Sequence, residues 1–171
     1  HLSLRRQRQM CIRDRTVTDG IAMGHEGMKS SLISREVIAD SAELTVRGHC
    51  YDALVGIAGC DKSLPGLMMS MLRLNVPSVF IYGGSILPGK FKGKDVTVVD
   101  VFEAVGKHSS GKMSSEELRE LELVACPSAG ACGGQFTANT MACVSEAIGL
   151  ALPYSAGTPA PYEERDKYAY E

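Results

Sequence analysis

The sequence predicts an α/β fold, a parallel sheet flanked by helices, and two observations lead to this prediction. Short apolar runs at Ala53–Ala58 and Ser78–Tyr82, each followed by glycine, are typical of strands buried on both faces. Helical segments separate and follow these runs, with apolar residues three and four positions apart. Strands that alternate with helices form parallel sheets with helices on both faces, and their chemistry lies in loops at the carboxyl ends of the strands.

The predicted helices follow from their start signals. Ser34 is a good N-cap for the first helix, which runs to about Gly48. Pro65 opens the second helix, which lies between the two predicted strands. Three more helices are predicted at Thr97–Lys107, at Ser114–Val124 and at roughly Thr137–Leu150.

The composition is that of an ordinary globular domain and excludes several functional classes. Of 171 residues, 44% are hydrophobic and 22% are charged, and the formal net charge is −2. This charge offers no basic field to nucleic acid or to a membrane surface, and the longest apolar runs are too short to span a bilayer. No signal peptide is recognisable. We therefore expect a soluble protein of the bacterial cytoplasm, or of an organelle in a eukaryote, with neither a nucleic-acid nor a membrane partner.

The six cysteines do not form a zinc-binding pattern. No two of them are spaced as C-x-x-C, which excludes a zinc ribbon. In a reducing compartment each would by default be a small buried hydrophobic residue. The cysteines are Cys11, Cys50, Cys60, Cys126, Cys132 and Cys143.

Both ends of the chain are set apart from the predicted domain. Residues 1–15 lack apolar periodicity, and Met10–Arg15 reads MCIRDR, the translation of a common sequencing adapter. We expect this segment to be non-native or disordered, which leaves residues 16–152 as a partial domain. Residues 153–171 are rich in proline, tyrosine and charge, and we expect a truncated, loop-like continuation.

The loop after the first predicted strand places a thiol, a carboxylate and an amine side by side. The carboxylate of Asp61 suits Mg²⁺ and the thiolate of Cys60 suits iron, so adjacent residues could hold two different metals near one substrate. Lys62 can ligate a hard cation only if its amine is carbamylated, which makes it an anionic oxygen ligand. The alternative, which spacing alone favours, is a polar turn with one buried cysteine and a solvated Asp–Lys pair.

A second motif surrounds Cys132, in the glycine-rich stretch before the last predicted helix. Glycine lets the backbone approach a ligand closely, and a thiol at the start of a helix gains N–H hydrogen bonds and a lowered pKa. Such a thiol suits an iron–sulfur cluster and equally suits a catalytic nucleophile. Cys126 is better explained as structural or supporting than as a ligand, and Cys143, within the apolar helix, as a core residue.

Two further motifs are less specific. Asp19 follows a short strand-like run and could be a second carboxylate for a divalent cation, although Asp-Gly alone is typical of a turn. Gly84–Lys90 nearly fits the phosphate loop G-x-x-x-x-G-K. However, Phe91 stands where Ser or Thr would hold Mg²⁺, and no helix is predicted directly behind the loop. We interpret it as a structural loop, with nucleotide binding as the alternative from another functional class.

Four ordered motifs together resemble the dihydroxy-acid and sugar-acid dehydratase family. They are DGIAMGHEGM (Asp19–Met28), SREVIADSAE (Ser34–Glu43), GCDKSLPG (Gly59–Gly66) and ACGGQFTANTM (Ala131–Met141). The resemblance runs from about Thr16 to the C-terminus. Because members of the family are several times longer than the matched part, it implies an incomplete N-terminal domain of a larger two-domain enzyme.

The resemblance also implies a set of site residues. Cys60 and Cys132 match two ligands of an iron–sulfur cluster, a 2Fe-2S cluster rather than the 4Fe-4S cluster of some relatives. Asp19 and Asp61 match Mg²⁺ ligands, and Lys62 matches the lysine that binds Mg²⁺ when carbamylated. A further cluster cysteine would precede Asp19, and the serine base and a glutamate ligand would lie in an absent C-terminal part. No catalytic base is therefore expected in this chain, which alone should be inactive; full-length members are typically homodimers.

The reaction implied by the resemblance is a dehydration. These motif forms are closest to the family's enzyme for branched-chain dihydroxy acids, which converts 2,3-dihydroxy-3-methyl acids to 2-oxo acids in valine and isoleucine synthesis. A base removes the C2 proton, the C3 hydroxyl leaves as water and the enol tautomerises, while the metals supply Lewis acidity. The alternative within the family is a sugar-acid dehydratase that acts on an aldonate or phosphogluconate.

Overall fold

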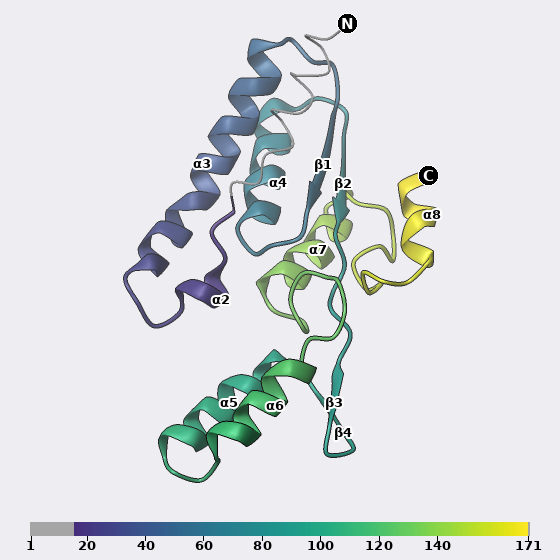
Figure 1. Ribbon diagram of the computed structural model, residues 1–171. Coiled ribbons are helices and arrows are strands. Elements are labelled where there is room, and N and C mark those ends of the chain that lie inside the picture. The colour runs from purple at the N-terminus through teal and green to yellow at the C-terminus, as the bar shows by residue number, and fades with distance from the viewer. Residues whose placement is uncertain (1–15, 171) are drawn as a thin grey trace, which may run out of the picture.

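The computed structural model describes residues 16–170 (Figure 1). The prediction that residues 1–15 are non-native or disordered lies outside this part of the chain. At the centre of the described chain lies a parallel pair of strands, β1 (Leu54–Ala58) and β2 (Ser78–Tyr82). Leu54 lies opposite Ser78, and Ala58 lies opposite Tyr82. Both strands coincide with predicted apolar runs, and the α/β class is confirmed.

Helix α4 (Ser63–Leu74) connects the two strands and lies between the sheet and the long helix α3 (Gly27–Gly48) (Figure 1). Helix α7 (Thr137–Ala147) packs against α4 and β2. One hydrophobic cluster joins these elements, so α4 and α7 cover the same face of the sheet. Its buried members are Ala58, Leu64, Met68, Met71, Phe80, Tyr82, Ala138, Ala142, Ala151 and Ala156.

The opposite face of β1 is open in the described part of the chain. Val55 is 61% exposed and Ile57 is 69% exposed, whereas Gly56 between them is buried against α4. The prediction that this strand is buried on both faces is therefore wrong for residues 16–170. The apolar run did not distinguish the two faces because both carry apolar side chains.

Helix α3 begins eight residues earlier than predicted: its N-cap residue is Glu26 and not Ser34. Ser34 lies inside the helix, where its hydroxyl donates to the carbonyl of Ser31 at 2.6 Å, so it is not an N-cap. The side chain of the N-cap residue Glu26 makes no capping hydrogen bond. Instead, the ring Nδ1 of His25 accepts the N–H of Gly27 at 3.0 Å. A histidine in a glycine-rich turn is a weak start signal, which explains the error.

The central part of the chain forms a second unit. Strands β3 (Gly89–Phe91) and β4 (Lys94–Val96) make an antiparallel hairpin that was not predicted. Its turn, Lys92-Gly93, has positive φ at both residues (49° and 78°), as the tightest hairpins require. The last two residues of Gly84–Lys90 already belong to β3, and a second strand, not a helix, comes next. The phosphate-loop alternative therefore does not fit, and the structure supports the structural loop.

Two helices behind this hairpin agree with their predicted ranges. In α5 (Val98–Ser109) the hydroxyl of Thr97 accepts the N–H of Val99 and the carboxylate of Asp100 accepts the N–H of Thr97 at 2.7 Å. In α6 (Ser115–Val124) the Ser114 hydroxyl accepts the N–H of Glu117 at 3.1 Å. The predicted bounds of both helices are therefore correct to within two residues, and each helix begins directly after its own capping hydroxyl.

The two ends of the described chain also contain short helices. Asp19 lies in a helical turn, α2 (Asp19–Ala22), and not after a strand. Residues 153–171 were predicted to be loop-like, but α8 (Glu164–Tyr170) lies within them (Figure 1). Among the described residues, no helix is both long and apolar enough to cross a membrane.

The close contact between α3 and α4 leads to a matched pair of predictions. A Cβ at Gly66 in α4 would lie 2.8 Å from Cγ2 of Ile38 and 2.9 Å from the carbonyl oxygen of Arg35, both in α3. A Cβ at Gly106 in α5 would meet nothing within 4 Å. We expect Gly66→Ala to destabilise the fold by about 1–2 kcal/mol, since crowding outweighs the better helix propensity of alanine, and Gly106→Ala to stabilise it by about 0.5–1 kcal/mol. Urea unfolding of both variants would measure this difference; a gain in stability from Gly66→Ala would contradict the predicted crowding.

Candidate metal-binding site

The structure brings three of the predicted site residues into contact. Asp61 and Lys62 follow β1 at the carboxyl edge of the sheet, and Asp19 approaches from α2. The Nζ of Lys62 lies 2.7 Å from Oδ2 of Asp19 and 2.8 Å from Oδ2 of Asp61. Asp61 and Lys62 are buried, 9% and 8% exposed, so the alternative of a solvated Asp–Lys pair does not fit.

The positive charge of Lys62 and the negative charges of the two carboxylates stabilise one another. Burial opposes ionisation of Asp19, but its contacts with Asp61, Lys62 and Ser31 outweigh burial and lower the pKa of its carboxyl to about 2. Burial would likewise lower the pKa of Lys62, but its hydrogen bonds to the two carboxylates raise it. The cluster therefore holds two carboxylates around one cation.

Cys60 lies beside the same carboxylates. Its thiol is 3.1 Å from Oδ1 of Asp61 and 3.9 Å from the hydroxyl of Thr18. The backbone around it is fixed by Ser63, whose hydroxyl accepts the N–H of Cys60 at 3.2 Å and donates to its carbonyl at 3.0 Å. Burial, together with the hydrogen bond and charge of Asp61, raises the pKa of the thiol to about 11. A pKa this high keeps the thiol protonated near neutral pH.

Cys132 lies in a loop that is bound to the end of β2. Ala131 N–H donates to the carbonyl of Gly84 at 2.7 Å, and Ile86 N–H donates to the carbonyl of Cys132 at 2.9 Å. Cys132 itself has a φ of 71°, a left-handed conformation that is unusual for a residue other than glycine. A Cβ on Gly59 would lie 3.1 Å from Cβ of Ala131, so this loop reaches the segment that carries Cys60.

The charge of Asp61 extends to Cys132 as well. The predicted lowering of the pKa of the Cys132 thiol is wrong, because burial raises it; the hydrogen bond from Gly133 N–H opposes this, and the charges of Asp61 and Cys126 add to it. One carboxylate thus acts on both thiols that were predicted as cluster ligands. The structure thereby gathers all five predicted residues around the carboxyl ends of β1 and β2.

Of the other cysteines with a specific prediction, Cys143 differs from its predicted environment. Cys143 is exposed and not in the core, because α7 turns Ala138, Ala142 and Ser145 inward instead. Cys126 is exposed, close enough to Cys132 for its charge to act there. The general expectation of small buried thiols fails for every described cysteine, since Cys60 is half-buried and the rest are exposed.

The donor atoms of the cluster fit a hard divalent cation. Two carboxylates face one point that the Lys62 ammonium fills, and a carbamate on that lysine would add a third anionic oxygen there. Oxygen donors completed by water are the ligands that Mg²⁺ prefers. Between residues 16 and 170 no three His, Cys, Asp or Glu side chains could hold a metal by themselves, so a cation at this point would need a further ligand besides the two carboxylates. For iron, Cys60 and Cys132 are suitable soft donors that make up an incomplete set.

Sequence reasoning missed two residues that hold this site in place. Ser31 in α3 donates a hydrogen bond to Oδ1 of Asp19, and Tyr82 at the end of β2 donates from its hydroxyl to the carbonyl of Ala131 at 2.9 Å. Both are buried. A serine on a helix and a tyrosine on a strand have no pattern that reports such contacts; only the folded structure brings the partners together.

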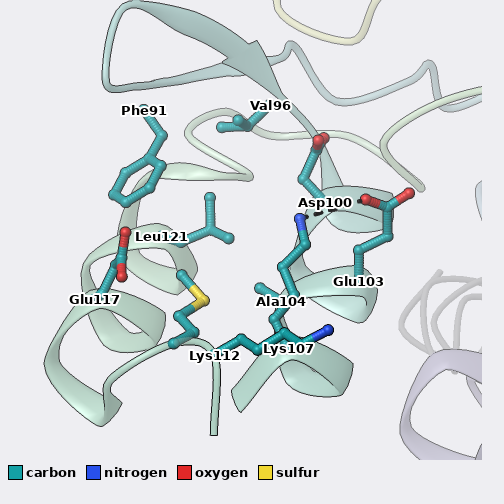
Figure 2. A pocket seen from close by; sticks show the side chains of 10 residues that line it. Phe91, Val96, Asp100, Glu103, Ala104, Lys107, Lys112, Glu117 and Leu121 are labelled. Atoms are coloured by element: carbon teal, nitrogen blue, oxygen red, sulfur yellow. Dashed lines mark ion pairs between the residues drawn. The ribbon is translucent and has the colours of Figure 1, made fainter. Parts of the chain in front are cut away.

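A separate cavity of about 220 Å³ lies between the β3–β4 hairpin, α5 and α6 (Figure 2). Its floor is apolar, with Val96, Ala104 and Leu121, and charged side chains surround it. Of these, Lys107 pairs with Glu103 at 3.8 Å. None of the five predicted site residues lines this cavity, so we do not assign it to the site.

Comparison with known proteins relates the sequence to one family. Residues 8–171 match the family model described as dihydroxy-acid/6-phosphogluconate dehydratase N-terminal. Over 154 residues, 90% of the chain, the sequence is 94% identical to a protein of Pelagibacter ubique and 85% identical to one of Parvibaculum lavamentivorans, both named dihydroxy-acid dehydratase. A protein of the same name from Metallosphaera sedula is 60% identical over 153 residues. The match covers 27% of each of the first two proteins and 28% of the third, so the chain spans about a quarter of the length of these relatives.

Proposed function

Because the chain belongs to the dihydroxy-acid/6-phosphogluconate dehydratase N-terminal family, we propose that it is the metal-binding part of an enzyme that removes water from a 2,3-dihydroxy carboxylic acid. The contact of Asp19 and Asp61 with Lys62, beside the thiol of Cys60, is the observation that carries this proposal. The names of the relatives at 94% and 85% identity favour 2,3-dihydroxy-3-methyl acids over aldonates as substrates. The product would then be a 2-oxo acid used in valine and isoleucine synthesis.

The proposal assigns two metal cofactors to the site. Asp19, Asp61 and carbamylated Lys62 would hold Mg²⁺, and Cys60 and Cys132 would hold part of an iron–sulfur cluster, which we propose to be 2Fe-2S. When bound, these groups supply Lewis acidity at the hydroxyl groups and the carboxylate of the substrate.

The chain's own contribution is to fix these donor atoms relative to one another. The carboxylate of Asp61 accepts hydrogen bonds from Nζ of Lys62 at 2.8 Å and from Sγ of Cys60 at 3.1 Å. Its two oxygens therefore link the proposed magnesium and iron ligands. Because Cys60, Asp61 and Lys62 are adjacent in one loop, groups bound to them would be held at a fixed separation, which would orient the substrate. The base that takes the C2 proton is proposed to be a serine in the part of the relatives that this chain does not cover. The full-length enzyme is proposed to be a cytoplasmic homodimer that acts on a small molecule.

A segment exchange tests the proposed substrate. In the chimera, the aligned 154-residue segment of the Pelagibacter ubique relative is replaced by the corresponding segment of this chain. We expect the chimera to dehydrate 2,3-dihydroxy-3-methylbutanoate and to leave gluconate unchanged, measured as 2-oxo acid formed under anaerobic conditions. The purified 171-residue chain is the control and should show no turnover, because it lacks the proposed base. Efficient turnover of gluconate by the chimera would replace the proposed substrate with a sugar acid. Turnover by the isolated chain would contradict the proposal that the base lies in the part of the relatives that this chain does not cover.

A further inference from the structure

A buried hydroxyl on α3 lies against one of the proposed Mg²⁺ ligands. Ser31 is 0% exposed, and its Oγ is hydrogen bonded to Oδ1 of Asp19 and lies 3.1 Å from the carbonyl oxygen of Val17. It falls between the first two sequence motifs: the first motif ends at Met28 and the second begins at Ser34. The residue is therefore part of the site in space, although no motif includes it.

The two oxygens of the Asp19 carboxylate have different partners. Oδ1 faces the Ser31 hydroxyl, and Oδ2 lies 2.7 Å from Nζ of Lys62. A hydrogen bond at one oxygen restricts rotation of the carboxylate, so that the other oxygen keeps its direction. Hydrogen bonds to metal-ligating carboxylates act in this way, and their removal typically weakens metal binding.

Asp19 needs this support because its own segment is weakly ordered by local interactions. Helix α2 has only four residues, and its N-cap Thr18 makes no side-chain cap hydrogen bond. Residues 16–18 before it belong to no helix or strand. Tertiary contacts must therefore set the direction of the Asp19 carboxylate.

Helix α3 supplies such a contact from a rigid position. It has 22 residues and packs so closely on α4 that the backbone of Gly66 leaves no room for a Cβ beside Ile38. Lys62 is the N-cap residue of α4. The hydrogen bond from Ser31 thus ties Asp19 to the same pair of helices that fixes Lys62 and its neighbour Asp61.

We propose that Ser31 is a positioning residue of the metal site: it holds the Asp19 carboxylate in the direction in which it shares a divalent cation with Asp61 and Lys62. This inference rests on the proposed function. It concerns how the cation is held, and it can be measured without any substrate.

Ser34 provides a matched control on the same helix. It is also buried, 8% exposed, and its hydroxyl donates to the carbonyl of Ser31 at 2.6 Å. Ser34→Ala therefore removes a buried, hydrogen-bonded hydroxyl one turn away from Ser31 without removing a contact to Asp19. If Ser31 only fills space or supports the helix, alanine at either position should affect cation binding equally.

The test is Mn²⁺ binding to the chimera without substrate, measured by electron paramagnetic resonance, alongside thermal unfolding in EDTA. We expect Ser31→Ala to weaken Mn²⁺ binding about 10- to 100-fold and Ser34→Ala to leave it within about threefold of wild type. If Ser31→Ala does not fold, Ser31→Cys takes its place, because a thiol of similar size is a weak donor and should also weaken binding at least about tenfold.

The outcomes separate this inference from the proposed function. If the unsubstituted chimera binds Mn²⁺ and dehydrates its substrate, but Ser31→Ala or Ser31→Cys binds Mn²⁺ as tightly as Ser34→Ala, the role of Ser31 is overturned and the proposed function stands. If the unsubstituted chimera neither binds Mn²⁺ nor dehydrates the substrate, both are overturned.

Discussion

Replacing Lys62 by alanine is expected to remove dehydratase activity from the chimera, about 10³-fold or more in kcat/KM, and to destabilise its metal-free fold by about 3 kcal/mol. The Lys62 side chain is 10% exposed and separates two carboxylates that are 12% (Asp61) and 23% (Asp19) exposed. Without the ammonium, two like charges remain facing each other with little water to screen them. Activity is lost because the proposed third anionic ligand is lost as well.

The stability effect is measured by urea unfolding of the metal-free chimera and of its Lys62→Ala variant. Lys90→Ala is the matched control: this lysine also forms an ion pair, with Asp95, but is 73% exposed, and its loss should change the free energy of unfolding by less than about 0.5 kcal/mol. Excess Mn²⁺ should then raise the melting temperature of Lys62→Ala, since the added cation replaces the missing charge between the carboxylates. A variant as stable as wild type in EDTA would show that Lys62 does not neutralise the pair.

The elements that the sequence predicts well are those whose cause is local. Helices α5 and α6 begin at Thr97 and Ser114, whose hydroxyls cap their own helices. The two strands of the sheet are apolar runs bounded by glycine, and both were located to within one residue. In each case the residues that determine the structure lie within a few positions of it, so pattern and outcome agree.

The errors in the fold arise where a distant or unusual partner decides the outcome. The start of α3 depends on the ring of His25, and the hairpin β3–β4 depends on Lys92 adopting a left-handed conformation. The exposure of Val55 and Ile57 depends on which helices reach that face of the sheet, and an apolar run carries no information about that.

The site shows the same division. The adjacency of Cys60, Asp61 and Lys62 is visible in the sequence, but spacing alone favoured an ordinary turn. Asp19 is 43 positions from Lys62, and only the family resemblance assigned them to one site. Ser31 was found from the structure alone, because its contact with Asp19 is set by the packing of α2 and α3.

Serine substitution should divide the cysteines into two groups in the full-length chimera. We expect Cys60→Ser and Cys132→Ser each to lower bound iron and sulfide to below about a tenth of wild type and to remove the visible absorption, because cluster ligation depends on thiolate sulfur. Cys60 is half-buried beside Asp61, and Cys132 is held in a left-handed conformation by the loop that contacts Gly59. These two thiols lie where the carboxyl ends of the strands meet.

Cys143 and Cys126 are the controls for this experiment, since both are exposed, as Cys132 is, but neither was predicted as a cluster ligand. Cys143→Ser should retain the cluster, because the hydrogen bond of its thiol to Asn139 is long, 3.9 Å, and Cys143 was not predicted as a cluster ligand. Cys126→Ser is the more demanding control, since the charge of Cys126 acts on Cys132, so the two thiols lie in the same region. If Cys126→Ser loses the cluster and Cys132→Ser keeps it, the ligand has been assigned to the wrong thiol. If only Cys60→Ser and Cys132→Ser lose it, thiols 72 positions apart in the sequence serve one cluster, beside the two carboxylates that surround Lys62.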